Sequence, residues 1–294
     1  MKHSLSHIAL IMALLLAFSS CEKMLLPEDV ESDGTEPGNL TVSIFQLEQT
    51  PFASLSRAAV TDYCTRLNFA VYDSDGTRIK QVNQKVDDNT FGTASFSLDP
   101  GDYQLVVVAH SSDRGNPTMT NPAKIQFTNA TGYSDTFLYN TTLTVGEEPQ
   151  TLDVSLERIV SLCRFYINDA IPEGVAQLEF YYTGGSGAFN AATGLGSVNS
   201  KQKMTFDVQA GATGTHYDLY TFLHQPDDEI SVTVTAFDAD TVAVYKRDFD
   251  VPMARRKITN LSGDFFTGVT PGSGDLNITV SINATWDGEQ NVTY

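Results

Sequence analysis

The sequence is poor in basic residues. Lys and Arg together number 18 against 36 Asp and Glu in a chain of 294 residues, which gives a formal net charge of −18 at pH 7. A surface with this excess of negative charge repels nucleic acid and anionic lipid head groups. We therefore exclude both as binding partners.

Cysteine is also scarce, with three in the whole chain. Cys64 and Cys163 lie inside strand-like runs that are far apart in the sequence. Neither has a histidine nearby at a metal-ligand spacing, so they form no zinc site. In an oxidising compartment they could pair in one disulfide, but we expect two buried free thiols instead.

Familiar catalytic motifs are absent. The chain has no Gly-x-Ser-x-Gly elbow, no His-Glu-x-x-His and no phosphate-binding glycine loop. His110, His216 and His224 have no neighbour at a metal-ligand spacing. A carboxylate pair for hydrolysis stays open, because its members need not be close in sequence. We predict that the protein is not an enzyme and uses neither a cofactor nor a metal ion.

Helical periodicity is missing as well. Apolar and polar residues alternate instead, which places every second side chain on one face of a strand. Turn pairs such as Asp75-Gly76 and Pro100-Gly101 separate these runs. Repeated short strands with turn signals predict an all-β fold made of β-sandwiches. The alternating runs begin at Leu40, Leu67, Tyr103, Leu152, Val232 and Leu276.

Two of the runs resemble each other and favour a chain of two similar halves. Phe69–Asp75 and Val234–Asp240 are alternating strands that end in aromatic-Asp-x-Asp. A calcium loop would need more oxygen ligands and a closing glutamate, so we interpret the Asp pairs as hairpin turns. We place a boundary after Leu156. The prediction is an N-terminal β-sandwich over residues 39–156 and a C-terminal β-sandwich over residues 157–294.

The opening residues 1–20 have the parts of a secretory signal: a basic start, a short apolar run, and small residues before a break. The apolar run is too short for a lasting transmembrane helix. Ala17-Phe-Ser-Ser-Cys21 resembles the lipobox of bacterial lipoproteins, although Phe18 departs from the usual small residue. This resemblance implies cleavage between Ser20 and Cys21 and acyl chains on Cys21. Residues 21–38, which are acidic with Pro and Gly, predict a flexible tether.

Several stretches together resemble the fimbrial anchor family of Bacteroidales, the FimB-like lipoprotein subunits associated with fimbrillin. Their order and spacing carry the resemblance. It implies two transthyretin-like β-sandwiches in tandem, a lipid anchor in the outer membrane with the protein exposed at the cell surface, and a role in fimbria assembly and cell adhesion. The partners it implies are other fimbrial subunits. The stretches are Leu67–Gly76, Leu98–His110, Leu156–Phe165, Phe180–Gly187, Arg256–Phe266 and Thr285–Gly288.

Strand exchange is what this resemblance implies for assembly. In the family, one subunit donates an extended segment to a groove in the next, and an exposed sheet edge is the physical template for such pairing. Each candidate segment could equally be a resident strand of its own sheet. The candidates are Leu40–Leu47 and Leu276–Ala284, the latter through Leu276, Ile278, Val280 and Ile282.

A processed subunit is the first alternative. Stalk and tip fimbrillins of the group lose an N-terminal strand by cleavage after Arg or Lys, and Arg57-Ala58 resembles such a protease site. Asp240-Thr241-Val242 also resembles the acceptor motif for O-linked glycans in these bacteria, with Thr241 as the acceptor. The anchor, stalk and tip roles all stay open at this stage.

A surface glycan-binding lipoprotein is the second alternative. Such a site needs exposed aromatic faces beside hydrogen-bonding groups, and the candidates are Tyr181, Tyr182 and Trp286. The ligand would be a glycan on a host or bacterial surface. The sequence names neither the partner subunit nor the host target.

Overall fold

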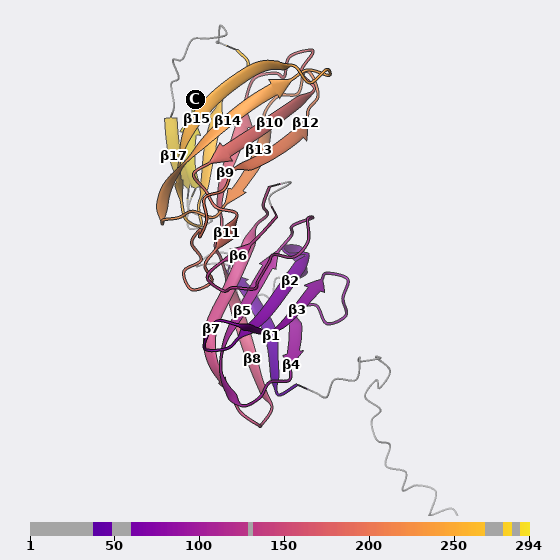
Figure 1. Cartoon of the computed structure of the whole chain (residues 1–294). Coiled ribbons are helices and arrows are strands. Elements are labelled where there is room, and N and C mark those ends of the chain that lie inside the picture. The colour runs from indigo at the N-terminus through magenta and orange to yellow at the C-terminus, as the bar shows by residue number, and fades with distance from the viewer. Residues whose placement is uncertain (1–37, 49–59, 129–131, 268–278, 284–288) are drawn as a thin grey trace, which may run out of the picture. The chain divides into compact units, whose positions relative to one another are not determined.

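The structure of the chain is a computed structural model. It describes residues 38–48, 60–128, 132–267, 279–283 and 289–294. Strands fill this part of the chain, and among the described residues there is no α-helix, only the single 3-10 turn η1 at Val60–Asp62. The prediction of an all-β fold of sandwich-like sheets is confirmed (Figure 1).

The first strands of the chain form a seven-stranded sheet in the order β3-β2-β5-β7-β8-β1-β4. β7 and β8 pair only through Phe137–Arg158 and Leu138–Glu157, so the sheet folds there into two layers. Apolar side chains from both layers form one core, which includes Phe69, Val107 and Val154. We refer to these strands as the N-terminal sandwich: β1 Leu40–Glu48, β2 Arg66–Tyr72, β3 Arg78–Lys85, β4 Thr93–Phe96, β5 Gly101–His110, β7 Thr136–Val145 and β8 Gln150–Arg158.

The later strands form a four-stranded sheet, β12-β10-β14-β15, and a five-stranded sheet, β13-β9-β16-β18-β17. A second core lies between them and includes Phe165, Phe180 and Phe249. We refer to these strands as the C-terminal sandwich: β9 Ser161–Ile167, β10 Gln177–Thr183, β12 Gln202–Asp207, β13 Thr215–Thr221, β14 Asp227–Phe237, β15 Ala243–Ala254, β16 Ile258–Gly263, β17 Thr279–Asn283 and β18 Glu289–Thr293.

The two sandwiches repeat one topology. In the N-terminal sandwich, β1 pairs in parallel with β8 and antiparallel with β4. In the C-terminal sandwich, β9 pairs in parallel with β16 and antiparallel with β13. The layer β3-β2-β5-β7 likewise corresponds to β12-β10-β14-β15. The hairpin β17–β18 has no counterpart, so it is an addition to the repeat.

A third apolar cluster joins the two sandwiches. It contains Val106 and Val108 of β5 together with Ile159, Val160 and Phe222. The short strands β6 (Ile125–Gln126) and β11 (Ala188–Phe189) pair with each other beside it, one from each part of the chain. Because this cluster covers the outer face of β5, every residue from Leu105 to His110 is buried. The predicted alternation in this strand therefore describes only its inner face.

The two predicted Asp turns have the same hydrogen bonds. In the turn between β2 and β3, the Asp73 carboxylate accepts the backbone N–H groups of Asp75 (3.0 Å) and Thr77 (2.8 Å). In the turn between β14 and β15, the Asp238 carboxylate accepts those of Asp240 (2.9 Å) and Val242 (2.8 Å). Both Asp pairs thus lie in hairpin turns, as predicted.

These turns do not occupy equivalent places in the repeat. The first joins β2 to β3, which correspond to β10 and β12, whereas the second joins β14 to β15. The sequence likeness of Phe69–Asp75 and Val234–Asp240 therefore marks a shared turn and not the repeated topology. Each turn has one residue with positive φ: Gly76 (78°) in the first and Thr241 (63°) in the second.

Strands change sheets between Arg158, where β8 ends, and Ser161, where β9 begins. The predicted boundary after Leu156 lies inside β8, two residues before its end. Residues from 37 to 294 form one compact unit. That the two sandwiches are separate folding domains stays a prediction.

Cys64 and Cys163 are both buried free thiols, as expected. Burial raises the pKa of both thiols, with that of Cys163 at about 12. Each thiol therefore stays protonated at neutral pH and is a poor nucleophile.

Candidate subunit interface

The N-terminal strand β1 fills a slot in the middle of its layer. It lies between β8, in parallel from Leu40 to Glu48, and β4, antiparallel from Leu40 to Ser43. Leu40 and Val42 are fully buried in the core, as the alternation predicts. The predicted segment Leu40–Leu47 is thus a resident strand, paired on both edges from Leu40 to Ser43 and with β8 beyond.

Two residues before the strand fix its position. The Asn39 side chain donates to the carbonyl oxygens of Leu98 and Gly146 (both 2.9 Å) and accepts the backbone N–H of Leu98 (2.9 Å). A Cβ at Gly38 would lie 2.2 Å from the carbonyl oxygen of Phe96, so only glycine fits. Sequence reasoning missed both residues, because neither belongs to an alternating pattern.

The second half of β1 is paired on one side only. A bulge at Phe45 shifts the register against β8 and leaves Phe45 46% exposed. The pairing with β4 stops at Ser43, opposite Thr93, and beyond it Ile44 donates its N–H to the Gly92 carbonyl at 2.9 Å. Within the described residues, the edge of β1 after Ile44 that faces away from β8 has no partner strand.

The added hairpin lies at the edge of the five-stranded sheet. β18 pairs in parallel with β16, from Ile258–Glu289 to Ser262–Thr293. β17 pairs antiparallel with β18 and is the outermost strand. Of the predicted exchange residues, Val280 and Ile282 belong to β17, whereas Leu276 and Ile278 lie outside the described residues.

β18 is held by the core. Val292 is fully buried, and the Tyr294 ring packs against Phe165 (5.2 Å between centroids) and Phe249 (5.1 Å). The Tyr294 hydroxyl donates to the carbonyl of Tyr166 (2.8 Å). Release of the whole hairpin would expose these groups, so an exchange that keeps β18 in place and uses the free edge of β17 costs less.

The edge strands of the three larger sheets differ in how they are protected against pairing with a strand of another chain. Natural proteins prevent unwanted pairing at an edge with charge, proline or a very short strand. β3 carries exposed Arg78, Lys80 and Lys85, β15 carries several charges and Pro252, and β4 has only four residues. β12 and β13 also carry charges. β17, Thr279-Val-Ser-Ile-Asn283, has neither charge nor proline.

Other predicted site residues have different outcomes. Ser20, Cys21, Arg57 and Ala58 lie outside the described residues, so lipidation and cleavage stay predictions. Thr241 is exposed at the apex of the β14–β15 turn. An exposed hydroxyl at a hairpin apex is accessible to a modifying enzyme, and O-glycosylation there also stays a prediction.

The predicted aromatic glycan site is wrong for Tyr182. This ring is fully buried, and its hydroxyl donates to the Tyr220 carbonyl at 3.1 Å. Tyr181 is half-buried on the opposite face of β10, and Trp286 lies outside the described residues. Alternation along β10 explains the result, because adjacent tyrosines must point to opposite faces.

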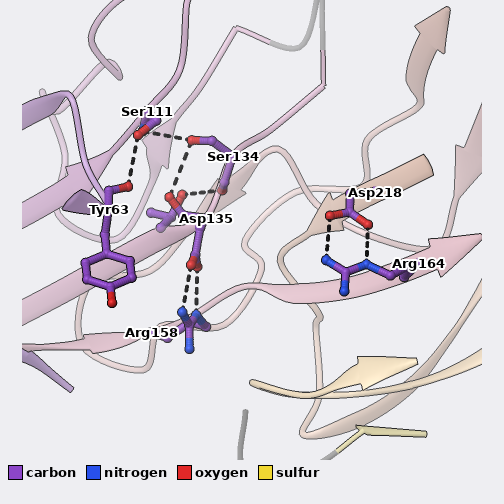
Figure 2. A network of polar contacts seen from close by, with 8 residues as sticks. Tyr63, Ser111, Ser134, Asp135, Arg158, Arg164 and Asp218 are labelled. Carbon is purple, nitrogen blue, oxygen red and sulfur yellow. Dashed lines mark hydrogen bonds and ion pairs between the residues drawn. The ribbon is translucent and has the colours of Figure 1, made fainter. Parts of the chain in front are cut away.

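Two Arg–Asp pairs fasten the strands on either side of the sheet change (Figure 2). Arg158 of β8 makes a two-pronged contact with Asp135 (both 2.7 Å), and Arg164 of β9 makes one with Asp218 of β13 (2.7 and 2.8 Å). Arg158 also lies 4.8 Å above the Phe137 ring. Such bidentate contacts fix the geometry of both side chains. We therefore assign a structural role to the two pairs.

The described part of the chain contains no group of three or more His, Cys, Asp or Glu side chains placed to hold a metal ion. Nor does any helix in this part have the length and apolar character needed to span a membrane. His110 is fully buried, bonded to Asn68 (2.9 Å) and to the Ser112 N–H (3.0 Å). Burial lowers its pKa to about 3, so it stays neutral.

A family model covers residues 34–294, and the chain therefore belongs to that family, described as a family of unknown function (DUF6562). No curated protein matches the sequence. Among solved structures, a candidate adhesin from Bacteroides ovatus is similar at 16% identity, with 74% of this chain and 84% of that chain covered and a TM-score of 0.51. This likeness shows the fold.

Two further structures align less well. The fimbrial anchor protein Mfa2 from Porphyromonas gingivalis is 13% identical, with 73% of this chain and 83% of that chain covered and a TM-score of 0.44. A candidate polysaccharide-binding protein from Bacteroides thetaiotaomicron is 15% identical, with 70% and 78% covered and a TM-score of 0.46. The fold shared with the Bacteroides ovatus structure agrees with the resemblance predicted from the sequence, at the level of the fold.

Proposed function

We propose that the protein is a non-enzymatic subunit of a surface fimbria, held at the outer membrane by acyl chains on Cys21 and joined to a second subunit at β17. The added hairpin carries this proposal. It lies outside the repeated topology, and β17 is an uncharged edge in a chain whose other long edges carry charge. An incoming strand would extend the five-stranded sheet through backbone hydrogen bonds.

The edge is tested with one substitution. Ser281→Lys adds to β17 the kind of charge that protects β3, so we expect the variant to lose its partner subunit on purification from cross-linked cells. Gln81→Lys in β3 is the matched control, since that edge already carries charge. Equal recovery of partner subunits with both variants would count against β17.

Lipid attachment is tested separately. Labelled palmitate should enter the wild type, and Cys21→Ala should leave the membrane fraction, because acyl chains supply the anchor. Retention of the unlabelled variant in membranes would overturn the anchor role. It would leave the β17 contact untouched.

A processed stalk or tip subunit is the second candidate function. It is favoured by the place of β1: Arg57 follows this strand in the chain, so a cut there would separate Leu40–Glu48 from the rest. Loss of β1 would leave β8 and β4 with unpaired edges around an apolar groove. Mass spectrometry of surface material would then find an N-terminus at Ala58, whereas acylated Cys21 on the intact chain would exclude it.

A further inference from the structure

A cavity of about 280 Å³ lies beside the third apolar cluster. Its described lining comes from both parts of the chain and contains no Asp, Glu, Lys, Arg or His. The lining provides hydroxyl groups, one amide and one aromatic ring. We call it the junction pocket: Thr118, Gln126, Phe127, Thr128, Tyr133, Gly187 and Ser200.

A buried hydroxyl without a partner among the described residues belongs to this pocket. Tyr133 is 6% exposed, and no described residue forms a hydrogen bond with its hydroxyl. Burial raises its pKa to about 12, so the group stays a neutral phenol. A buried polar atom left unpaired costs about 1–3 kcal/mol, and such an exception in a folded protein calls for a ligand, water or functional role.

Glycine at position 187 creates the space around this hydroxyl. A Cβ at Gly187 would lie 1.9 Å from the Tyr133 oxygen and 3.2 Å from the Ser200 hydroxyl oxygen. The Gly187 N–H donates to that Ser200 oxygen at 2.9 Å. Two hydroxyl groups from distant parts of the chain therefore meet at one residue that has no side chain.

Ring contacts and backbone hydrogen bonds hold the floor of the pocket in place. The centroid of the Phe127 ring lies 4.9 Å from that of His110 and 5.9 Å from that of Phe222. The backbone N–H of Phe127 donates to the Gly187 carbonyl at 2.9 Å. A pair of backbone hydrogen bonds between Thr118 and Gln126 (2.8 and 3.0 Å) fixes one wall. A preorganised site loses little freedom when it binds a ligand.

We propose that the junction pocket binds one uncharged sugar ring, as a free monosaccharide or the terminal unit of a glycan. The described lining has no charged side chain, which disfavours ions, and its hydroxyl and amide groups suit a polyhydroxylated ligand. The volume lies just below the range of about 300–1,000 Å³ typical of drug-sized ligands, which suits a single ring. A ligand hydroxyl would satisfy the Tyr133 phenol.

The probes are the methyl glycosides of glucose, galactose, mannose and N-acetylglucosamine, titrated into the full chain and followed by ligand-observed NMR. We expect at least one to bind at millimolar concentration. Tyr133→Phe should weaken the binding of that glycoside by about tenfold, which corresponds to about 1.4 kcal/mol. The melting temperature of this variant should stay the same or rise, because the substitution removes a buried hydroxyl that lacks a partner among the described residues.

Tyr103→Phe is the matched control, since its hydroxyl bonds to the Asp99 carbonyl outside the pocket. Gly187→Ala serves as a second variant that fills the space, with circular dichroism to confirm folding. The proposal is overturned if none of the four glycosides binds the wild type, if Tyr133→Phe binds as well as Tyr103→Phe, or if a crystal soaked with the glycosides has only water in the pocket.

Discussion

The two sandwiches have the same strand topology but differ at their ends. In the N-terminal sandwich, the last strand β8 has one parallel neighbour, β1, which comes from the start of the chain. In the C-terminal sandwich, the equivalent strand β16 has two parallel neighbours, β9 and the added β18. The comparison teaches that the repeat is common to both sandwiches, β1 included, and that the β17–β18 hairpin is the part that departs from it. We therefore expect assembly at this hairpin.

Substitution of β1 should have the largest effect. Val42→Asp places a charge in the N-terminal core, where Val42 is fully buried, and should cost about 4 kcal/mol or more. Thr41→Asp on the other face of the same strand is the control, since Thr41 is half-buried and faces Ser95. Urea unfolding measures both. A similar loss for the two variants would contradict the assigned register of β1.

The two Arg–Asp pairs should differ in strength. The Arg158 and Asp135 side chains are 8% and 20% exposed, whereas those of Arg164 and Asp218 are 28% and 26% exposed. Asp135→Ala removes both charge-assisted hydrogen bonds of a buried guanidinium and should cost about 3 kcal/mol. Asp218→Ala should cost about 1 kcal/mol, because water screens that pair. Equal losses of stability for the two variants in thermal unfolding would contradict the claim that burial makes the Arg158–Asp135 pair the stronger one.

Acid should weaken the N-terminal sandwich through His110. Its folded pKa of about 3 lies below the ordinary value of 6.5, so the unfolded chain binds the extra proton between these values. The part of the unfolding free energy that depends on neutral His110 is fully present above pH 6.5. It is lost as the pH falls toward 3, at about 1.4 kcal/mol per pH unit. His110→Gln should remove this part of the slope. An unchanged slope in urea unfolding from pH 6.5 to 4 would refute the assignment.

The two Asp turns should give the smallest effect, with opposite signs. Thr241 has φ 63°, a conformation that costs a residue with a Cβ about 1 kcal/mol or more relative to glycine. Thr241→Gly should therefore stabilise the protein by about 1 kcal/mol, and Gly76→Thr should destabilise it by a similar amount. Differential scanning calorimetry measures both, and a change of the same sign in the two variants would contradict the shared geometry.

Alternation predicted much of this fold, because the inner faces of β1, β2 and β8 follow it closely. Alternation did not predict burial in β5, because the third apolar cluster covers the outer face of this strand. Residues on both faces are then buried, and a two-residue period cannot indicate this. The sequence favoured two similar halves, but the likeness that suggested them, Phe69–Asp75 and Val234–Asp240, lies on strands that do not correspond in the repeat. Asn39 was missed because a side chain that bonds to distant carbonyls leaves no local pattern.

The candidate interface was predictable only in part. The alternation of Leu276–Ala284 indicated a strand, but only the sheet order shows β17 at an edge, with β18 held by Tyr294. The sequence made both Tyr181 and Tyr182 candidates for an exposed aromatic face. The pleat separates them, and the buried partner of Tyr182 follows from tertiary packing alone.

Site-directed cross-linking in living cells tests the central proposal most directly. Cys64 and Cys163 are buried, so a cysteine introduced at Ser281 in β17 reports its own neighbours, with Lys80→Cys in β3 as the comparison. The account predicts that Ser281→Cys is captured together with a second fimbrial subunit, whereas Lys80→Cys is not. Capture of a subunit by Lys80→Cys alone, or by neither variant on a chain present at the cell surface, would contradict it.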